Sequence, residues 1–226
     1  ALLKTANASI HKANLTEKIL IPALVKLSNF VPGGGIWMNT ERPEWNDANN
    51  ALVGYGLSMV TTGHLLRYLE FCREWWSELD HDKQVFLSAP VAEFVDSLLP
   101  IFTNRETDPS ICTRDDTLRA QVVCELGLSG QRYRDRVYAG DFETSKNLPL
   151  KAVLDLLEGA ERWLRATLDA AKRPDSLMDS YNLLDYSEDR SSMSVSRLYE
   201  MLEGQVSGLS AGHLSSSEAV KLVDTM

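Results

Sequence analysis

The sequence predicts an all-α protein built from antiparallel helical hairpins, and three observations indicate this fold class. Apolar residues recur at the helical period of about 3.6 along most of the chain. Residues typical of helix N-caps stand immediately before several of these periodic stretches. No run of residues alternates cleanly between apolar and polar side chains, as a half-buried strand would. Successive helices joined by turns pack side by side as hairpins, so few or no strands are expected.

Four helical segments are expected in the N-terminal part of the chain. Asn14, with Glu17 three residues later, is expected to open a helix that continues to residue 27. A long helical segment is expected over residues 48–79, and further helices over 83–99 and 116–137. The expected core residues of the first two segments are Leu20, Leu24, Leu27, Leu52, Tyr55, Met59, Val60, Leu66 and Leu69.

The most regular helical pattern lies in the C-terminal half. One apolar stripe predicts a helix with Asn147 as its N-cap, and it comprises Leu150, Val153, Leu154, Leu157, Ala160, Leu164 and Leu168. On the opposite face, acidic residues precede basic ones by four positions in the pairs Glu158–Arg162 and Glu161–Arg165, the order that stabilises a helix. A second stripe predicts a helix capped by Ser194, and it comprises Val195, Leu198, Tyr199, Leu202, Val206 and Leu209. Ser215 and Glu218 form the pattern of a capping box that opens a final helix.

Composition and charge argue against several functional classes. The chain has 226 residues, of which 44% are hydrophobic and 24% charged, which fits a single helical domain over residues 1–226. A net charge of −9 disfavours nucleic acid as a partner, because phosphates attract basic surfaces. No apolar run approaches the roughly 20 residues that span a bilayer, so a soluble protein without a membrane segment is expected. Cys72, Cys112 and Cys124 lack metal-type spacing and indicate reduced thiols, as in the cytoplasm, and no cofactor is expected.

Residues 33–50 concentrate side chains suited to carbohydrate recognition. Tryptophan faces stack on the apolar faces of sugar rings, whereas amide, guanidinium and carboxylate groups hydrogen-bond to sugar hydroxyls. A carboxyl group partly desolvated beside an aromatic ring has a raised pKa, which suits a general acid. The alternative, which composition alone favours, is that Asn46 or Asp47 caps the following helix and that the acidic residues favour its positive end. The candidate acid is Glu44, and the candidate substrate-binding residues are Trp37, Glu41, Arg42, Trp45, Asn46, Asp47, Asn49 and Asn50.

A second polar and aromatic cluster, residues 179–186, separates two of the expected helices. In an array of hairpins it could lie at the same rim as the acidic loop of residues 40–47, so Tyr181 and Asn182 are further candidate substrate-binding residues. An ordered loop that uses the turn chemistry of Asp and Asn is an equally good interpretation. Residues 208–212 match the nucleophile-elbow pattern of serine hydrolases, but that elbow follows a strand and here a helix is expected before it.

Residues 44–50, Glu-Trp-Asn-Asp-Ala-Asn-Asn, resemble the Asp-Trp-Asn-Asp-Gly motif of (α/α)6-barrel carbohydrate enzymes of the cellobiose-phosphorylase and glycoside-hydrolase type. The resemblance implies that the helical hairpins form part of an (α/α) toroid. It also implies cleavage of a glycosidic bond by hydrolysis or phosphorolysis, with a carbohydrate as substrate and inorganic phosphate as the second substrate of a phosphorylase. The first acid of the family motif is the general acid, which gives this role to Glu44. The chain departs from the motif at Glu44 and Ala48, where the family has Asp and Gly.

The sequence predicts fewer helices than a complete toroid contains, so the chain is expected to form a portion of a larger barrel. The second catalytic group would then lie outside it. Helices at an open edge would expose apolar stripes, so the chain alone is expected to be oligomeric or marginally stable, and inactive. The expected partners are therefore the remainder of the barrel or further copies of the chain. The alternative function, from another class, is a non-catalytic helical binding or interaction module.

Overall fold

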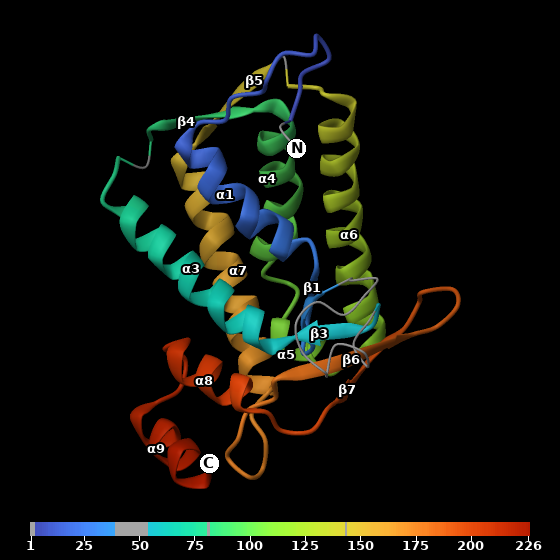
Figure 1. Ribbon diagram of the computed structural model, residues 1–226, viewed down its shortest axis with the longest axis vertical. Helices are drawn as coiled ribbons and strands as arrows, with labels where there is room; N and C mark the ends of the chain where they lie inside the picture. Colours follow the sequence, from blue (N-terminus) through green and yellow to red (C-terminus); the bar gives the residue numbers. More distant parts are fainter. Residues whose placement is uncertain (1–2, 39–53, 81, 143) are drawn as a thin grey trace.

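A computed structural model describes residues 3–38, 54–80, 82–142 and 144–226 (Figure 1). A layer of long helices stands on a five-stranded antiparallel sheet that curls into half of a barrel. The fold is therefore mixed, with 56% helix and 16% strand, and the prediction of an all-α protein is wrong. The arrangement as part of an (α/α) toroid is wrong for the same reason, because a substantial sheet closes one end of the helices.

The helical layer is built around α7 (Leu150–Ala170), which contacts α3 (Met59–Ser77) and α4 (Ala89–Thr103). Helix α4 also contacts α6 (Asp116–Ala139) and α1 (Leu15–Leu27). The short α5 (Pro109–Cys112) connects α4 to α6, and α8 (Leu202–Ser210) packs on α3 ahead of the C-terminal α9 (Ser216–Thr225). Within the part of the chain that the structure describes, no helix is both long and apolar enough to cross a lipid bilayer.

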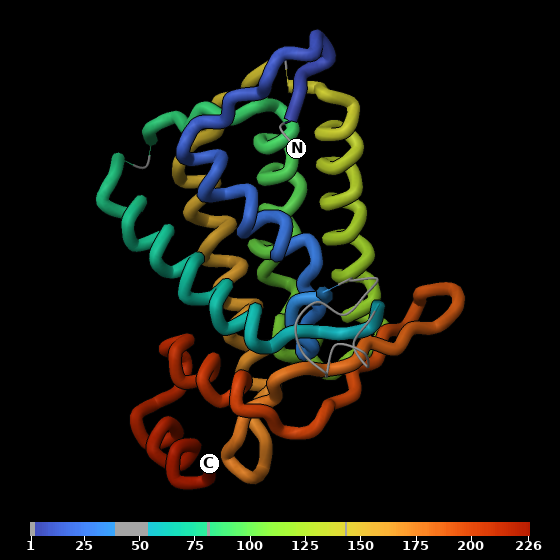
Figure 2. Tube along the Cα trace, in the orientation of Figure 1, coloured from blue at the N-terminus to red at the C-terminus, as the bar shows by residue number. Residues whose placement is uncertain are grey.

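The main sheet collects short strands from both ends of the chain. Its order is β1 (Phe30–Val31), β2 (Gly35–Trp37), β3 (Gly56–Ser58), β6 (Tyr181–Tyr186) and β7 (Met193–Arg197), with every neighbouring pair antiparallel. A separate pair, β4 (Gln84–Ser88) with β5 (Ser145–Pro149), lies at the opposite end of the helical layer. The tube in Figure 2 shows the N-terminal and C-terminal strands side by side in the main sheet.

Two apolar clusters hold these layers together. The larger one lies among the helices, where the Trp163 ring meets those of Phe30 and Phe102 edge to face, at centroid distances of 6.5 and 6.1 Å. Such edge-to-face contacts add about 0.5–1.5 kcal/mol each beyond the burial of apolar area. The smaller cluster packs the sheet against α6 and comprises Val31, Leu57, Ala120, Val123, Leu184 and Met193. The sheet and the lower part of α6 therefore share one apolar interface.

Several helix signals in the sequence are confirmed. The Asn14 side chain caps α1 by accepting a hydrogen bond of 2.9 Å from the Glu17 amide. Ser215 and Glu218 form both hydrogen bonds of a capping box at the start of α9. All seven apolar residues of the stripe that predicted α7 are buried. These features depend on residues within about one or two turns of each other, which a sequence pattern captures.

Several predicted boundaries are wrong because strands occupy the positions where helices were expected. Asn147 lies in β5, and Pro149 takes the N-cap position of α7. Residues 83–99 begin with β4, and α3 begins only at Met59, after β3. Residues 193–197, around the expected cap Ser194, form β7, so the second stripe is helical only from Leu202 onward. The pairs β3–β6 and β4–β5 join segments distant in sequence, whereas β7 pairs with β6 in a hairpin, and the helical periodicity of the sequence reveals none of these partners.

The polar face of α7 pairs with its neighbouring helices. Glu161 accepts a 2.7 Å hydrogen bond from Arg73 of α3, and Arg165 pairs with Glu70 of α3. Arg162 donates to the Phe102 carbonyl at 3.2 Å, at the end of α4. Glu161, Arg162 and Arg165, which the sequence predicted to pair within one helix, therefore hold α7 against α3 and α4.

Candidate functional site

An apolar groove of about 460 Å³ lies between α6 and the hairpin formed by β6 and β7. We call it the aromatic groove, and it is lined by Trp37, Val123, Cys124, Gly127, Leu128, Gln131, Tyr186, Arg190 and Met193. Its volume falls within the range of about 300–1,000 Å³ that is usual for small-molecule sites. The lining is mainly apolar with a few polar groups, which is the common composition of such sites.

Three aromatic side chains meet at the sheet end of the groove. Trp37 ends β2, and its indole Nε1 donates a 2.9 Å hydrogen bond to the Gly54 carbonyl. The Trp37 and Tyr55 rings both lie beside Tyr186, with centroid distances of 6.4 and 6.1 Å. The Tyr55 ring is half exposed, so this aromatic surface is available to a ligand. The hydrogen bond fixes the indole plane, which a stacking platform requires.

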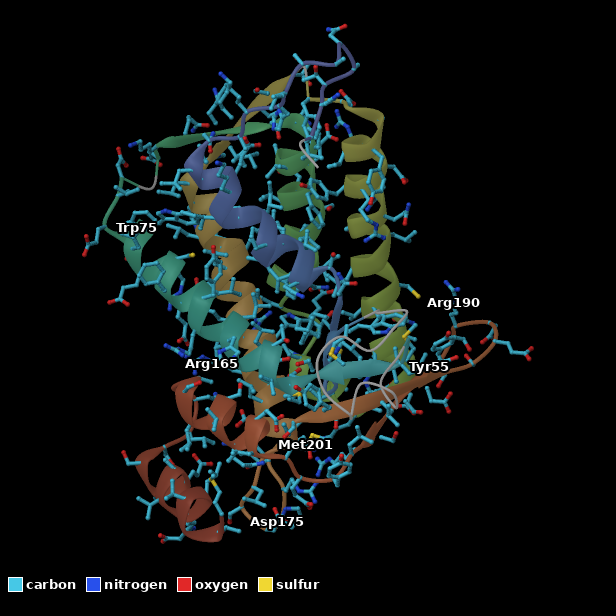
Figure 3. The ribbon with its side chains drawn as sticks, in the orientation of Figure 1. Tyr55, Trp75, Arg165, Asp175, Arg190 and Met201 are labelled. Atoms are coloured by element: carbon cyan, nitrogen blue, oxygen red, sulfur yellow. The ribbon has the colours of Figure 1, made fainter. Side chains whose placement is uncertain are left out.

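The turn between β6 and β7 supplies a cation at the outer end of the groove. Arg190 occupies the left-handed region with φ of 57°, at the tip of this turn. The Asp189 carboxylate accepts hydrogen bonds from the Ser187 hydroxyl at 2.7 Å and from the Ser191 amide at 3.1 Å. These bonds lower the pKa of Asp189 to about 2, with the Ser187 bond as the largest cause. Figure 3 labels Arg190 and Tyr55, both near the lower end of α6.

The helical wall of the groove is open because of a glycine in the middle of α6. An added Cβ at Gly127 would meet no atom within 4 Å, so the space above it belongs to the groove. Leu128 beside it is 61% exposed and lines the groove. Gln131 lies one turn further on, and its side-chain amide donates to Asp135 at 2.6 Å.

Residues 39–53, which we call the acidic segment, join β2 to β3. Glu41, Arg42, Glu44, Trp45, Asn46, Asp47, Asn49 and Asn50 lie outside the described residues, and so does the expected core residue Leu52. The chain on either side is described: the Met38 amide donates to the Gly56 carbonyl at 3.0 Å, and Trp37 is bonded to Gly54. The chain therefore leaves β2 and returns to β3 at the aromatic end of the groove.

The other two predicted binding residues are buried in the sheet. Tyr181 is 3% exposed and Asn182 is 1% exposed. Burial, and secondarily Glu203, raise the pKa of Tyr181. The Asn182 amide donates to the Gly34 carbonyl at 3.0 Å, which ties β6 to the turn between β1 and β2. Asn182 and Trp37 share one row of the sheet with Leu57 between them, but neither Asn182 nor Tyr181 lines the groove.

A second hollow, of about 520 Å³, is polar and lies beside β7 and the start of α6. Arg119, one of the residues that line it, is buried and donates to the backbone carbonyls of Pro32, Thr113 and Met193. Arg119 also pairs with Asp116. This guanidinium is therefore occupied in joining α6 to both ends of the sheet, and the hollow is a weaker candidate than the aromatic groove.

Sequence reasoning found Trp37 but missed the helical wall of the groove. The one signal available in the sequence was Gly127 beside Leu128, a pair that leaves an apolar and unfilled patch on a long helix. Among the described residues, no group of three or more His, Cys, Asp or Glu side chains is placed to hold a metal ion. No family model and no curated protein matches this chain. The features of this chain that bear on its function are therefore the geometry of the groove and the residues of the acidic segment.

Proposed function

We propose that this chain binds a carbohydrate in the aromatic groove and cleaves its glycosidic bond with Glu44 as the general acid. One observation carries the proposal. Trp37 and Tyr55, which flank the acidic segment in the sequence, both place their rings beside Tyr186 at the groove. The carboxylates of residues 39–53 are thus on a connection that begins and ends at an aromatic surface.

The chemistry of the groove supports a sugar as its ligand. The apolar faces of a pyranose ring stack on indole and phenol rings, which Trp37 and Tyr186 supply. Arg190 and Gln131 carry the donors that bind ring hydroxyls at the edges. The sheet-containing fold differs from the toroid of the resembling enzymes, so the proposal depends on the residues of the segment and not on barrel geometry.

Binding is tested with a matched pair of substitutions at Gly127. The wild-type protein is screened against a glycan panel, and the best ligand is titrated calorimetrically. Gly127→Ala adds a single methyl group in open space and should leave the affinity unchanged. Gly127→Leu fills the groove and should weaken binding at least about tenfold, which corresponds to about 1.4 kcal/mol. Equal affinity of the two variants would show that the glycan binds elsewhere.

Catalysis is tested with Glu44→Gln on nitrophenyl and unactivated glycosides, each with and without inorganic phosphate. Loss of a general acid lowers turnover by about 10²–10⁴-fold, most strongly for a poor leaving group. Glu106→Gln, at an exposed residue that does not line the groove, serves as the control. Full turnover of an unactivated glycoside by Glu44→Gln would remove Glu44 from this role. A requirement for phosphate would identify phosphorolysis.

A non-catalytic binding module is the second candidate, and the composition of the groove favours it. None of the described residues that line the groove is acidic, so the groove by itself can bind but has no proton donor of that kind. Glycan binding that is sensitive to Gly127→Leu, with no turnover of any glycoside, would establish the binding module in place of the enzyme.

A further inference from the structure

Helix α3 presents an exposed face with two large aromatic side chains at its centre. Phe71 is 62% exposed and Trp75 is 47% exposed, and their rings stack at a centroid distance of 6.1 Å. Figure 3 labels Trp75 at the margin of the molecule, on the outer side of α3. We call this surface the α3 outer face, and it comprises His64, Arg67, Phe71, Glu74, Trp75 and Glu78, all exposed. Positions separated by three, four and seven residues lie on one side of a helix, so these six form a single stripe.

Charge is distributed unevenly along this stripe. The basic residues His64 and Arg67 precede Phe71, whereas Glu74 and Glu78 follow it. A second copy whose α3 ran parallel to this one would place basic residues against basic residues and acidic residues against acidic ones. An antiparallel copy would place the basic half of each helix against the acidic half of the other.

We infer that a second copy of this chain docks on the α3 outer face, with the two α3 helices antiparallel and the two-fold axis at Phe71. In this register Phe71 meets Phe71 of the other copy. Arg67 lies against Trp75 and Glu74 of the other copy, where it makes a cation–π contact and an ion pair. His64 lies opposite Glu78. The contact is isologous, so every favourable pair occurs twice.

The area available fits the centre of such an interface. A fully packed Phe or Trp buries about 150–250 Å², so the exposed parts of Phe71 and Trp75 amount to roughly 200 Å² per copy. A standard interface buries about 800 Å² per partner, and its binding energy is concentrated in a few central aromatic and arginine residues. Phe71, Trp75 and Arg67 have that composition, and the flanking surface of α3 would supply the rest.

The test is sedimentation of the wild-type chain over a wide concentration series. We expect a reversible dimer, and a chain that stays monomeric at every concentration would overturn the inference. Phe71→Glu places the acid of one copy against the same acid of the other at the two-fold axis and should weaken dimerisation at least about tenfold. Tyr138→Glu, at another highly exposed aromatic residue, is the control and should dimerise like the wild type. An undiminished dimer of Phe71→Glu would place the contact elsewhere.

A mixing experiment tests the antiparallel register. Arg67→Glu alone places two acids together in each half of the contact, and Glu74→Arg alone places two bases together, so both variants should be monomeric. Mixed in equal amounts they should form a heterodimer, because each acid then faces a base. Thermal denaturation confirms that both variants are folded, as expected for substitutions at exposed positions. Absence of the heterodimer would overturn the antiparallel register.

Discussion

Replacing Gly159 by alanine should destabilise the protein, whereas the same change at Gly127 should stabilise it. Both glycines lie in the middle of long helices, where alanine is favoured over glycine by about 1 kcal/mol. The surroundings differ. A Cβ at Gly127 meets nothing within 4 Å, but a Cβ at Gly159 would lie 2.7 Å from the Phe102 carbonyl oxygen.

The two effects have different magnitudes. At Gly127 only the helix propensity changes, so a gain of about 1 kcal/mol should raise the Tm by about 2–4 °C in a chain of this size. At Gly159 the obstacle is backbone of α4, which cannot rotate away, so α4 and α7 must separate. Overpacking costs about 1–3 kcal/mol and propensity returns about 1, which leaves a net loss of up to about 2 kcal/mol.

The assay is thermal and urea denaturation of the wild type and both variants, followed by circular dichroism. Opposite signs of the change in the free energy of unfolding are the expected result. Shifts of the same sign, or a Gly159→Ala protein more stable than the wild type, would refute the packing of α7 on α4 described above. The comparison is internal, because the two substitutions remove and add the same atoms.

Two further predictions concern buried and exposed charges. Arg119→Met should destabilise the chain by about 3–5 kcal/mol in urea denaturation, because the buried carbonyls that Arg119 joins lose their donor. Arg114→Met, at an exposed position, is the control and should change the stability by less than about 0.5 kcal/mol. The ion pair with Lys172 and the hydrogen bonds of the Ser215 cap lower the pKa of Glu218 to about 2, below the value of about 4.3 in the unfolded chain. The stability that ionised Glu218 adds to α9 is therefore present above about pH 4.3 and is lost as the pH falls toward 2. Hydrogen exchange, corrected for intrinsic rates, should show α9 losing protection across that interval, and Ser215→Ala should weaken α9 at neutral pH; protection independent of pH would contradict this.

The helices were predictable where their signals are local. The cap of α1 and the apolar stripe of α7 depend on contacts within one or two turns, and both are confirmed. The strands depend on partners far away, since β3 pairs with β6 across more than half of the chain. The apolar stripe that predicted a helix runs from Val195 to Leu209, but residues 193–197 form β7 because they make a ladder of backbone hydrogen bonds with β6. Propensity is a weak preference that such pairing overrides.

The residues of the candidate site also divide into those that the sequence identified and those that only the structure could place. Trp37 was identified from its side chain and its place beside the acidic residues, and the structure puts it in the lining of a groove. Tyr181 and Asn182 were identified by residue type alone, and burial in β6 removes both from the surface. Tyr186, in the same cluster, shares a face of β6 with Asn182 but lies at the groove because it ends the strand, next to the turn that carries Arg190.

The sequence by itself determined where α1, α6, α7 and α9 form, because caps and 3.6-residue periodicity are properties of neighbouring residues. It also placed aromatic and acidic side chains together in one short segment. Only the tertiary structure decided that 30–37 and 56–58 join 181–197 in one sheet. The same pairing brings Trp37 and Tyr186 together against Gly127 of α6. The sequence could not show this, because long-range backbone hydrogen bonds and shared apolar burial leave no periodic pattern in the chain.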